Sequence, residues 1–123
     1  MATGESHRRT PPMSRRVGDR HTPRELSAIG HGGKYRVCVI VGTRPEAIKM
    51  APVILELAQH RQVVETVVVT TAQHREMLSQ ALDAFGIKTH VDLGLMSTKQ
   101  ALADFTARAM LALSSCFSEL RPD

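Results

Sequence analysis

The feature that most constrains the fold is a pair of short, β-branched apolar runs, each followed by a helical pattern. The first run, YRVCVIV, covers residues 35–41, and the second, VVETVVVTT, covers residues 63–71. Continuous apolar runs of this length are typical of parallel strands that are covered on both faces. Because helical patterns separate them, the sequence predicts right-handed crossovers and a doubly wound, Rossmann-like α/β sheet.

The first crossover helix is expected over residues 45–59, with a kink or a break at Pro52. Its predicted buried face is the set of apolar residues at three- and four-residue steps: Ile48, Ala51, Pro52, Leu55 and Ala58.

A second helix is expected over residues 75–86, where Gly86 provides a stop signal. Its apolar residues are Met77, Leu78, Ala81, Leu82 and Phe85. A short third strand is expected within residues 89–95, followed by a long helix over 98–120. The apolar side of that helix is Leu102, Phe105, Ala109, Leu113, Phe117 and Leu120.

In a doubly wound sheet the first strand usually lies between the second and the fourth. No fourth strand is predicted within the 123 residues. A Val-rich first strand with a bare hydrogen-bonding edge is an aggregation hazard that natural domains normally cover. We therefore interpret residues 34–123 as an incomplete, N-terminal part of a Rossmann-like domain.

The net charge of +4 belongs to the start of the chain. Residues 1–34 hold 7 Lys and Arg against 3 Asp and Glu, whereas residues 35–123 hold 9 of each. Residues 1–33 are rich in Pro, Gly, Arg and Ser and lack periodicity, so we expect a disordered basic leader. No aromatic residue interleaves its arginines, which argues against a nucleic-acid partner.

No apolar stretch approaches the roughly 20 residues that a membrane-spanning helix needs, so no membrane partner is expected. Cys38 and Cys116 are far apart in the sequence and fall at positions expected to be buried. Reduced thiols and a cytoplasmic location are the expectation. The 6 histidines show no HExxH pattern and no ligand-like spacing with the cysteines, and therefore no metal site is predicted.

The segment GTRPEAIK, residues 42–49, occupies the place where parallel sheets bind ligands, beyond the carboxyl end of a strand. It is neither a P-loop nor a GxGxxG fingerprint. Either Thr43 and Glu46 form a capping box, or Arg44 caps the helix with Pro45 at the first helical position.

Arg44 and Lys49 place two cations at the positive end of that helix, where they repel each other unless an anion joins them. Alternatively they pair with Glu46 or are simply hydrated, and the sequence alone does not choose. Beyond the second strand, Gln73, His74, Arg75 and Glu76 gather further polar groups that suit an ordinary surface helix start as well as a binding site.

Together, GTRPEAIKMAP and QHREML, followed by DAFGI, resemble the non-hydrolysing UDP-N-acetylglucosamine 2-epimerases from about Lys34 to Asp123. The resemblance implies a glycosyltransferase-B architecture of two Rossmann-like domains, of which this chain is a fragment. It also implies an isomerase without a cofactor, a homodimer for full-length members, and a role in cell-envelope polysaccharide synthesis. The implied reaction interconverts UDP-GlcNAc and UDP-ManNAc by elimination and re-addition of UDP.

The resemblance assigns substrate binding to Arg44 and Lys49, and we expect Lys49 to act in catalysis by stabilising the departing diphosphate. It associates Gln73, His74, Lys99 and Gln100 with a regulatory site for a second substrate molecule. Lys99 stands where the family often has an arginine, and a lysine cannot form the same planar fork.

The catalytic carboxylates of the family lie beyond the region of resemblance, so the chain alone is expected to be inactive. The alternatives are a non-catalytic nucleotide-sugar-binding module, a truncated product without activity, and a glycosyltransferase of the same architecture.

Overall fold

A computed structural model of the chain describes residues 32–71 and 74–123. The predicted leader therefore lies outside the described residues except for Gly32 and Gly33. The elements, in order, are β1 (Tyr35–Val41), α2 (Arg44–Gln59), β2 (Val64–Thr70), α3 (Arg75–Ala84), β3 (Val91–Asp92) and α4 (Leu102–Leu120). The predicted alternation of strands and helices is confirmed, although the third strand has only two residues.

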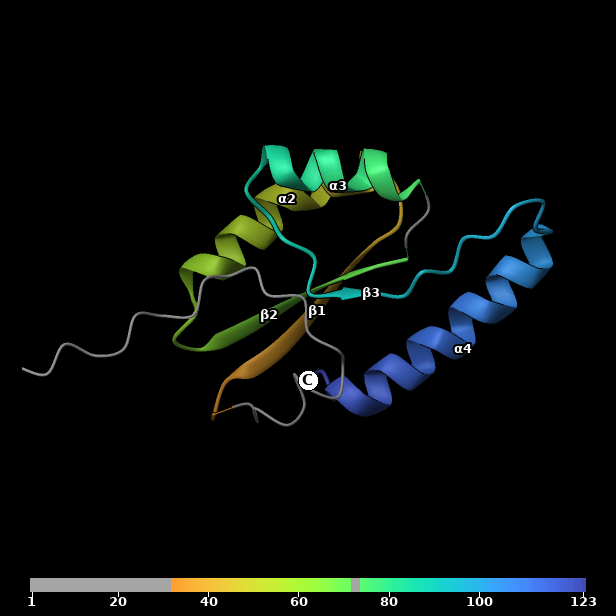
Figure 1. Cartoon of the computed structure of the whole chain (residues 1–123). Helices are drawn as coiled ribbons and strands as arrows, with labels where there is room; N and C mark the ends of the chain where they lie inside the picture. The colour runs from red at the N-terminus through yellow and green to blue at the C-terminus, as the bar shows by residue number, and fades with distance from the viewer. Residues whose placement is uncertain (1–31, 72–73) are drawn as a thin grey trace, which may run out of the picture.

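The strands form a parallel sheet in the order β1-β2-β3. Helices α2 and α3 cover one face of this sheet, and α4 lies on the other face (Figure 1). The Rossmann-like class is thus confirmed. Within the described residues β1 has only β2 as a strand neighbour.

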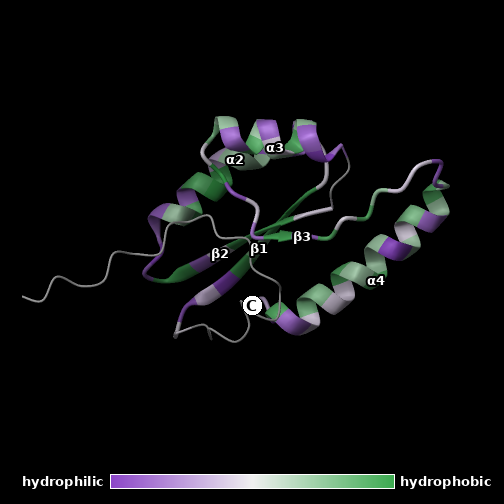
Figure 2. Ribbon diagram, viewed as in Figure 1, coloured by the Kyte–Doolittle hydropathy of each residue, from purple (hydrophilic) through white to green (hydrophobic). Residues whose placement is uncertain are grey.

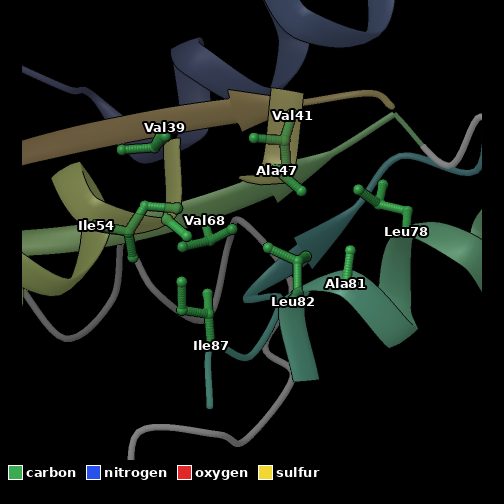
Figure 3. Close-up of a cluster of buried hydrophobic side chains, with 10 residues drawn as sticks. Val39, Val41, Ala47, Ile54, Val68, Leu78, Ala81, Leu82 and Ile87 are labelled. Atoms are coloured by element: carbon green, nitrogen blue, oxygen red, sulfur yellow. The ribbon is translucent and has the colours of Figure 1, made fainter. Parts of the chain in front are cut away.

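The alternation of side chains along the strands divides the core into two clusters. On the side of α2 and α3, Val39, Val41 and Val68 pack against helical residues (Figure 3). The helical and loop members of this cluster are Ala47, Ala51, Ile54, Leu78, Ala81, Leu82 and Ile87. On the other side, Val67, Val69 and Val91 pack against Cys116 and Leu120 of α4.

The predicted buried face of α2 is wrong except for Ala51. The buried residues are Ala47, Ala51 and Ile54, whereas Ile48 and Leu55 are 46% and 40% exposed. Apolar residues occupy more than one stripe of this helix, and the stripe with two alanines allows the helix axis to approach the sheet closely. The helix also continues through Pro52, which lies on the exposed side, so the expected break is absent.

The second helix stops as predicted, with Gly86 at a φ of +69°. Leu78, Ala81 and Leu82 are buried, but Met77 and Phe85 are exposed. Helix α4 begins at Leu102 rather than at residue 98. The reason is local: Lys99 adopts a φ of +58°, which does not fit a right-handed helix.

Helix α4 meets the sheet only near its C-terminal end, through Cys116 and Leu120. Its first turn projects away from the strands (Figure 1), and Leu102 is 81% exposed. The predicted apolar side is therefore buried at one end only. Among the described residues, no helix is long and apolar enough to span a bilayer.

Arg36 is the buried charge that joins the end of α4 to the sheet. Its side chain is fully buried, and its Nε donates a 2.7 Å hydrogen bond to Glu65 Oε2 on β2. Its Nη1 donates to the carbonyl of Leu120 at 2.6 Å. The guanidinium thus satisfies a carbonyl at the C-terminus of α4, where cations are favoured.

Candidate functional site

Thr71 connects the segments at the carboxyl ends of the three strands. Its N–H donates to the carbonyl of Val41 at 3.2 Å, and its carbonyl accepts from the N–H of Leu95 at 3.1 Å. A Cβ on Gly42 would lie 2.7 Å from Thr71 Oγ1. A larger residue at position 42 would therefore force the Thr71 side chain or the backbone of this turn to shift.

The turn between β1 and α2 is held by the carboxylate of Glu46. Glu46 Oε2 accepts hydrogen bonds from the N–H of Gly42 at 2.8 Å and from the N–H of Thr43 at 3.0 Å. Thr43 is the N-cap, so the capping-box alternative is confirmed and Arg44 is not the cap. The carboxylate is engaged by backbone donors.

No ion pair joins Glu46 to Arg44 or Lys49, so that alternative is wrong, whereas the alternative in which both cations are simply hydrated agrees with the structure. Both cations are exposed, and neither has a hydrogen-bond or ion-pair partner among the described residues. Arg44 is the first residue of α2 and Lys49 lies five residues further along, in its second turn, with the lean toward the N-terminus that helical side chains share. Two unpaired cations at a helix N-terminus favour an anion of two or more charges.

The polar segment after β2 is fixed to β3 by an ion pair. Arg75 Nε donates to Asp92 Oδ2 at 2.9 Å, and Asp92 Oδ1 accepts from the N–H of Gly94 at 3.0 Å. His74 is exposed at the start of α3 with a φ of +51° and makes no side-chain cap. Gln73 lies outside the described residues.

Lys99 and Gln100, also assigned to the regulatory site, lie in the segment before α4. Lys99 is exposed in the left-handed conformation. Gln100 Oε1 accepts from the N–H and Oγ of Ser97, at 3.0 and 2.8 Å. The buried Nε2 of Gln100 has no partner among the described residues. No hydrogen bond or ion pair within that part of the chain joins either residue to His74.

The two cysteines are free thiols in the cluster between the sheet and α4, and Cys116 belongs to α4 itself. Burial raises the pKa of Cys38 to about 11, with a smaller contribution from Cys116. Burial, followed by the nearby Glu119, raises the pKa of Cys116. Both thiols are thus held in the protonated, unreactive form at neutral pH. No group of metal-ligating side chains occurs among the described residues.

Three structural residues were missed by the sequence interpretation: Arg36, Thr71 and Asp92. Arg36 had a visible signal, because it is the single charge inside the first apolar run. Thr71 and Asp92 had none, since their importance comes from contacts between loops that are distant in the sequence.

Comparison with known proteins gives consistent matches. The family model for UDP-N-acetylglucosamine 2-epimerase matches residues 55–123, more than half of the chain, beginning within α2 after Lys49. A UDP-N-acetylglucosamine 2-epimerase of Bacillus subtilis is 48% identical over 90 residues, which are 73% of this chain and 23% of the relative.

Solved structures match as well. UDP-GlcNAc 2-epimerase from Neisseria meningitidis, bound to UDP-GlcNAc, is 46% identical with a TM-score of 0.66, covering 72% of this chain and 24% of that one. A Staphylococcus aureus structure, MnaA with UDP, is 40% identical with a TM-score of 0.65, covering 72% and 23%. The expected fold class is confirmed, and the chain spans about a quarter of the length of these relatives.

Proposed function

Because the chain belongs to the UDP-N-acetylglucosamine 2-epimerase family, we propose that it contributes the diphosphate-binding turn of a nucleotide-sugar site. The observation that carries the proposal is the unpaired state of Arg44 and Lys49 beside a Glu46 that is already engaged. The ligand proposed is UDP-GlcNAc or UDP-ManNAc. The structure of the Neisseria relative bound to UDP-GlcNAc supports this choice.

The turn favours recognition by side chains over recognition by backbone amides. In a P-loop, backbone N–H groups face the phosphates. Here the N–H groups of Gly42 and Thr43 donate to Glu46, so they are not available to a ligand. The Arg44 guanidinium supplies a planar fork for two phosphate oxygens, and Lys49 supplies a compact positive charge.

In the proposed reaction, UDP leaves C1 of the sugar and is later added back. Negative charge then accumulates on the diphosphate as the C1–O bond breaks. Arg44 and Lys49 stabilise that charge more strongly than the charge of the intact substrate, which lowers the barrier to departure. Lys49 is accordingly the residue proposed to act in catalysis.

We also propose that the 123-residue chain does not epimerise by itself. Removal and return of the proton at C2 need positioned acid and base groups. At the carboxyl ends of the strands, Glu46 accepts from two backbone amides, and Asp92 is bonded to Arg75 and Gly94. Glu76 is exposed to water. None of them is a free carboxylate in an enclosed position.

The second candidate is a nucleotide-sugar-binding module without catalytic activity, which is favoured by the engagement of Glu46 and Asp92 in other hydrogen bonds. Regulation through Gln73, His74, Lys99 and Gln100, dimerisation of the full-length form and a cytoplasmic location stay predictions.

Binding is tested on the chain itself by titrating UDP while recording amide chemical shifts. We expect perturbations centred on residues 42–49 and a weaker response to uridine, which lacks the diphosphate. Lys49→Ala and Arg44→Ala should each weaken UDP binding about tenfold, as expected for one charge-assisted contact.

The matched control is Lys88→Ala. Lys88 is exposed in the loop between α3 and β3, which precedes a strand, whereas residues 42–49 follow one. It should bind UDP like the unmodified chain. Equal UDP affinity in the Lys49 and Lys88 variants would remove Lys49 from the site. Incubation of the chain with UDP-GlcNAc, followed by separation of the two epimers, tests the proposed inactivity, which any enzymatic turnover would contradict.

A further inference from the structure

The turn between β1 and α2 carries a negative charge of its own. Strand β1 is hydrophobic (green) toward its carboxyl end (Figure 2), and the two residues that follow it, Gly42 and Thr43, are uncharged. Within residues 42–49 the charges therefore all belong to α2: Arg44, Glu46 and Lys49. The two cations and the carboxylate leave one net positive charge for a ligand.

The carboxylate of Glu46 occupies the place that a small anion would take. Unpaired N–H groups at a helix start bind compact anions such as phosphate. Here Glu46 Oε2 accepts from the N–H of Gly42 at 2.8 Å and from the N–H of Thr43 at 3.0 Å. The same oxygen would lie 3.4 Å from a Cβ at residue 42, so it also lies over the glycine. A free anion has to displace this carboxylate to reach the two donors.

The first turn of α2 offers few other backbone donors. Pro45 has no N–H, and the capping box directs the N–H of Glu46 to the side chain of Thr43. The N–H of Arg44 is the remaining backbone donor of this turn. A compact anion at this helix start is thus opposed by an attached competitor and is left with one amide.

The hydrogen bonds of Glu46 do not require its charge. A glutamine at the same position of a capping box accepts the same bonds. The helix dipole favours the carboxylate, which accounts for a structural benefit of the charge. The charge also lowers the affinity of the turn for every anion. A diphosphate reaches the side chains of Arg44 and Lys49 without displacing Glu46, whereas a phosphate that depends on the amides does not have this route.

We propose that Glu46 is a specificity-determining residue: it excludes compact inorganic anions from the start of α2 and leaves Arg44 and Lys49 to the diphosphate of a nucleotide. The inference rests on the proposed function, because these two cations are the ligand groups of that site. It adds that the selectivity between a diphosphate and free phosphate comes from a carboxylate that does not contact the ligand.

Three variants of the 123-residue chain separate the two effects of Glu46. Glu46→Ala frees the amides of Gly42 and Thr43 and removes the charge. Glu46→Gln removes the charge but keeps an acceptor for the amides. Glu56→Ala is the matched control, because Glu56 is an exposed carboxylate of the same helix that pairs only with His60 among the described residues. Inorganic phosphate and UDP are titrated separately into each variant at low salt, with amide chemical shifts recorded.

We expect Glu46→Ala to gain at least about tenfold more affinity for phosphate than for UDP, as the opening of two charge-assisted hydrogen bonds predicts. The Gly42 and Thr43 amides should then shift with phosphate. Glu46→Gln should gain about fivefold for both ligands, because only a charge near the site is lost, and its selectivity should stay within twofold of the unmodified chain. Glu56→Ala should bind both ligands like the unmodified chain.

An unchanged ratio of the two affinities in Glu46→Ala would overturn the proposal. A saturable shift of the Gly42 and Thr43 amides when phosphate is added to the unmodified chain would also overturn it, and this reading requires no substitution. Thermal melting followed by circular dichroism checks that each variant keeps the fold. If UDP binds neither the unmodified chain nor any variant, the proposed function fails, whereas the phosphate titrations still decide the role of Glu46.

Discussion

Replacement of Arg36 by methionine tests whether one buried guanidinium ties α4 to the sheet. The substitution keeps most of the apolar stem and removes the charge. It deletes the 2.7 Å bond to Glu65 and the 2.6 Å bond to the Leu120 carbonyl. The backbone bonds between Arg36 and Asp123 do not depend on the side chain.

The expected loss is about 3 kcal/mol. A hydrogen bond to a charged group contributes roughly 1.5–3 kcal/mol, and at least two are lost. Removing one partner of a fully buried ion pair costs about 3–5 kcal/mol. The Glu65 side chain is 25% exposed and can regain water, which places the cost near the lower end of that range. Small domains are stable by only about 5–15 kcal/mol, so the effect is large.

Urea unfolding followed by circular dichroism measures this loss as a shift in midpoint at constant slope. Arg61→Met is the matched control, because Arg61 is exposed and has no ion pair among the described residues. It should stay within about 0.5 kcal/mol of the unmodified chain. If Arg36→Met behaved like Arg61→Met, the ion pair would have no net role and the reasoning would be wrong.

Two further predictions follow from the close contacts and the buried thiols. Gly42→Ala should destabilise the chain by about 1–3 kcal/mol, because its Cβ would meet Thr71 Oγ1 at 2.7 Å. Adding Thr71→Ala to this variant should recover part of the lost free energy of unfolding, measured with urea. If the free-energy changes of the two substitutions simply added, the steric cause would be contradicted. The folded-state pKa of Cys38, about 11, lies above its usual 9.0, so stability is complete below pH 9 and falls as the pH rises from there toward 11. The melting temperature of the unmodified chain should therefore drop more between pH 8 and pH 10.5 than that of Cys38→Ala, and equal drops would show that the thiol does not contribute.

The sequence was sufficient for the order and type of elements but not for the way in which the helices face the sheet. Strands of Val and Ile bounded by glycine are strongly constrained, and β1 was located to the residue. In α2 apolar residues lie on more than one stripe, and the buried stripe is the one with Ala47, Ala51 and Ile54. The hydrophobic pattern alone does not distinguish between such stripes. The exposed start of α4 was missed for a similar reason: apolar periodicity predicts a face, whereas burial needs a partner surface.

The candidate site shows where residue types suffice and where they do not. Arg44 and Lys49 were recognisable from their spacing, but the same spacing allowed Glu46 to neutralise them. In the structure Glu46 forms no ion pair with either cation, and its Oε2 accepts from two amides instead. A capping residue that occupies the N-terminal amides leaves the helix start with fewer donors for a ligand, so an anion bound there depends on the two side-chain cations. Substitution of either cation should therefore lower affinity for the diphosphate far more than it lowers stability.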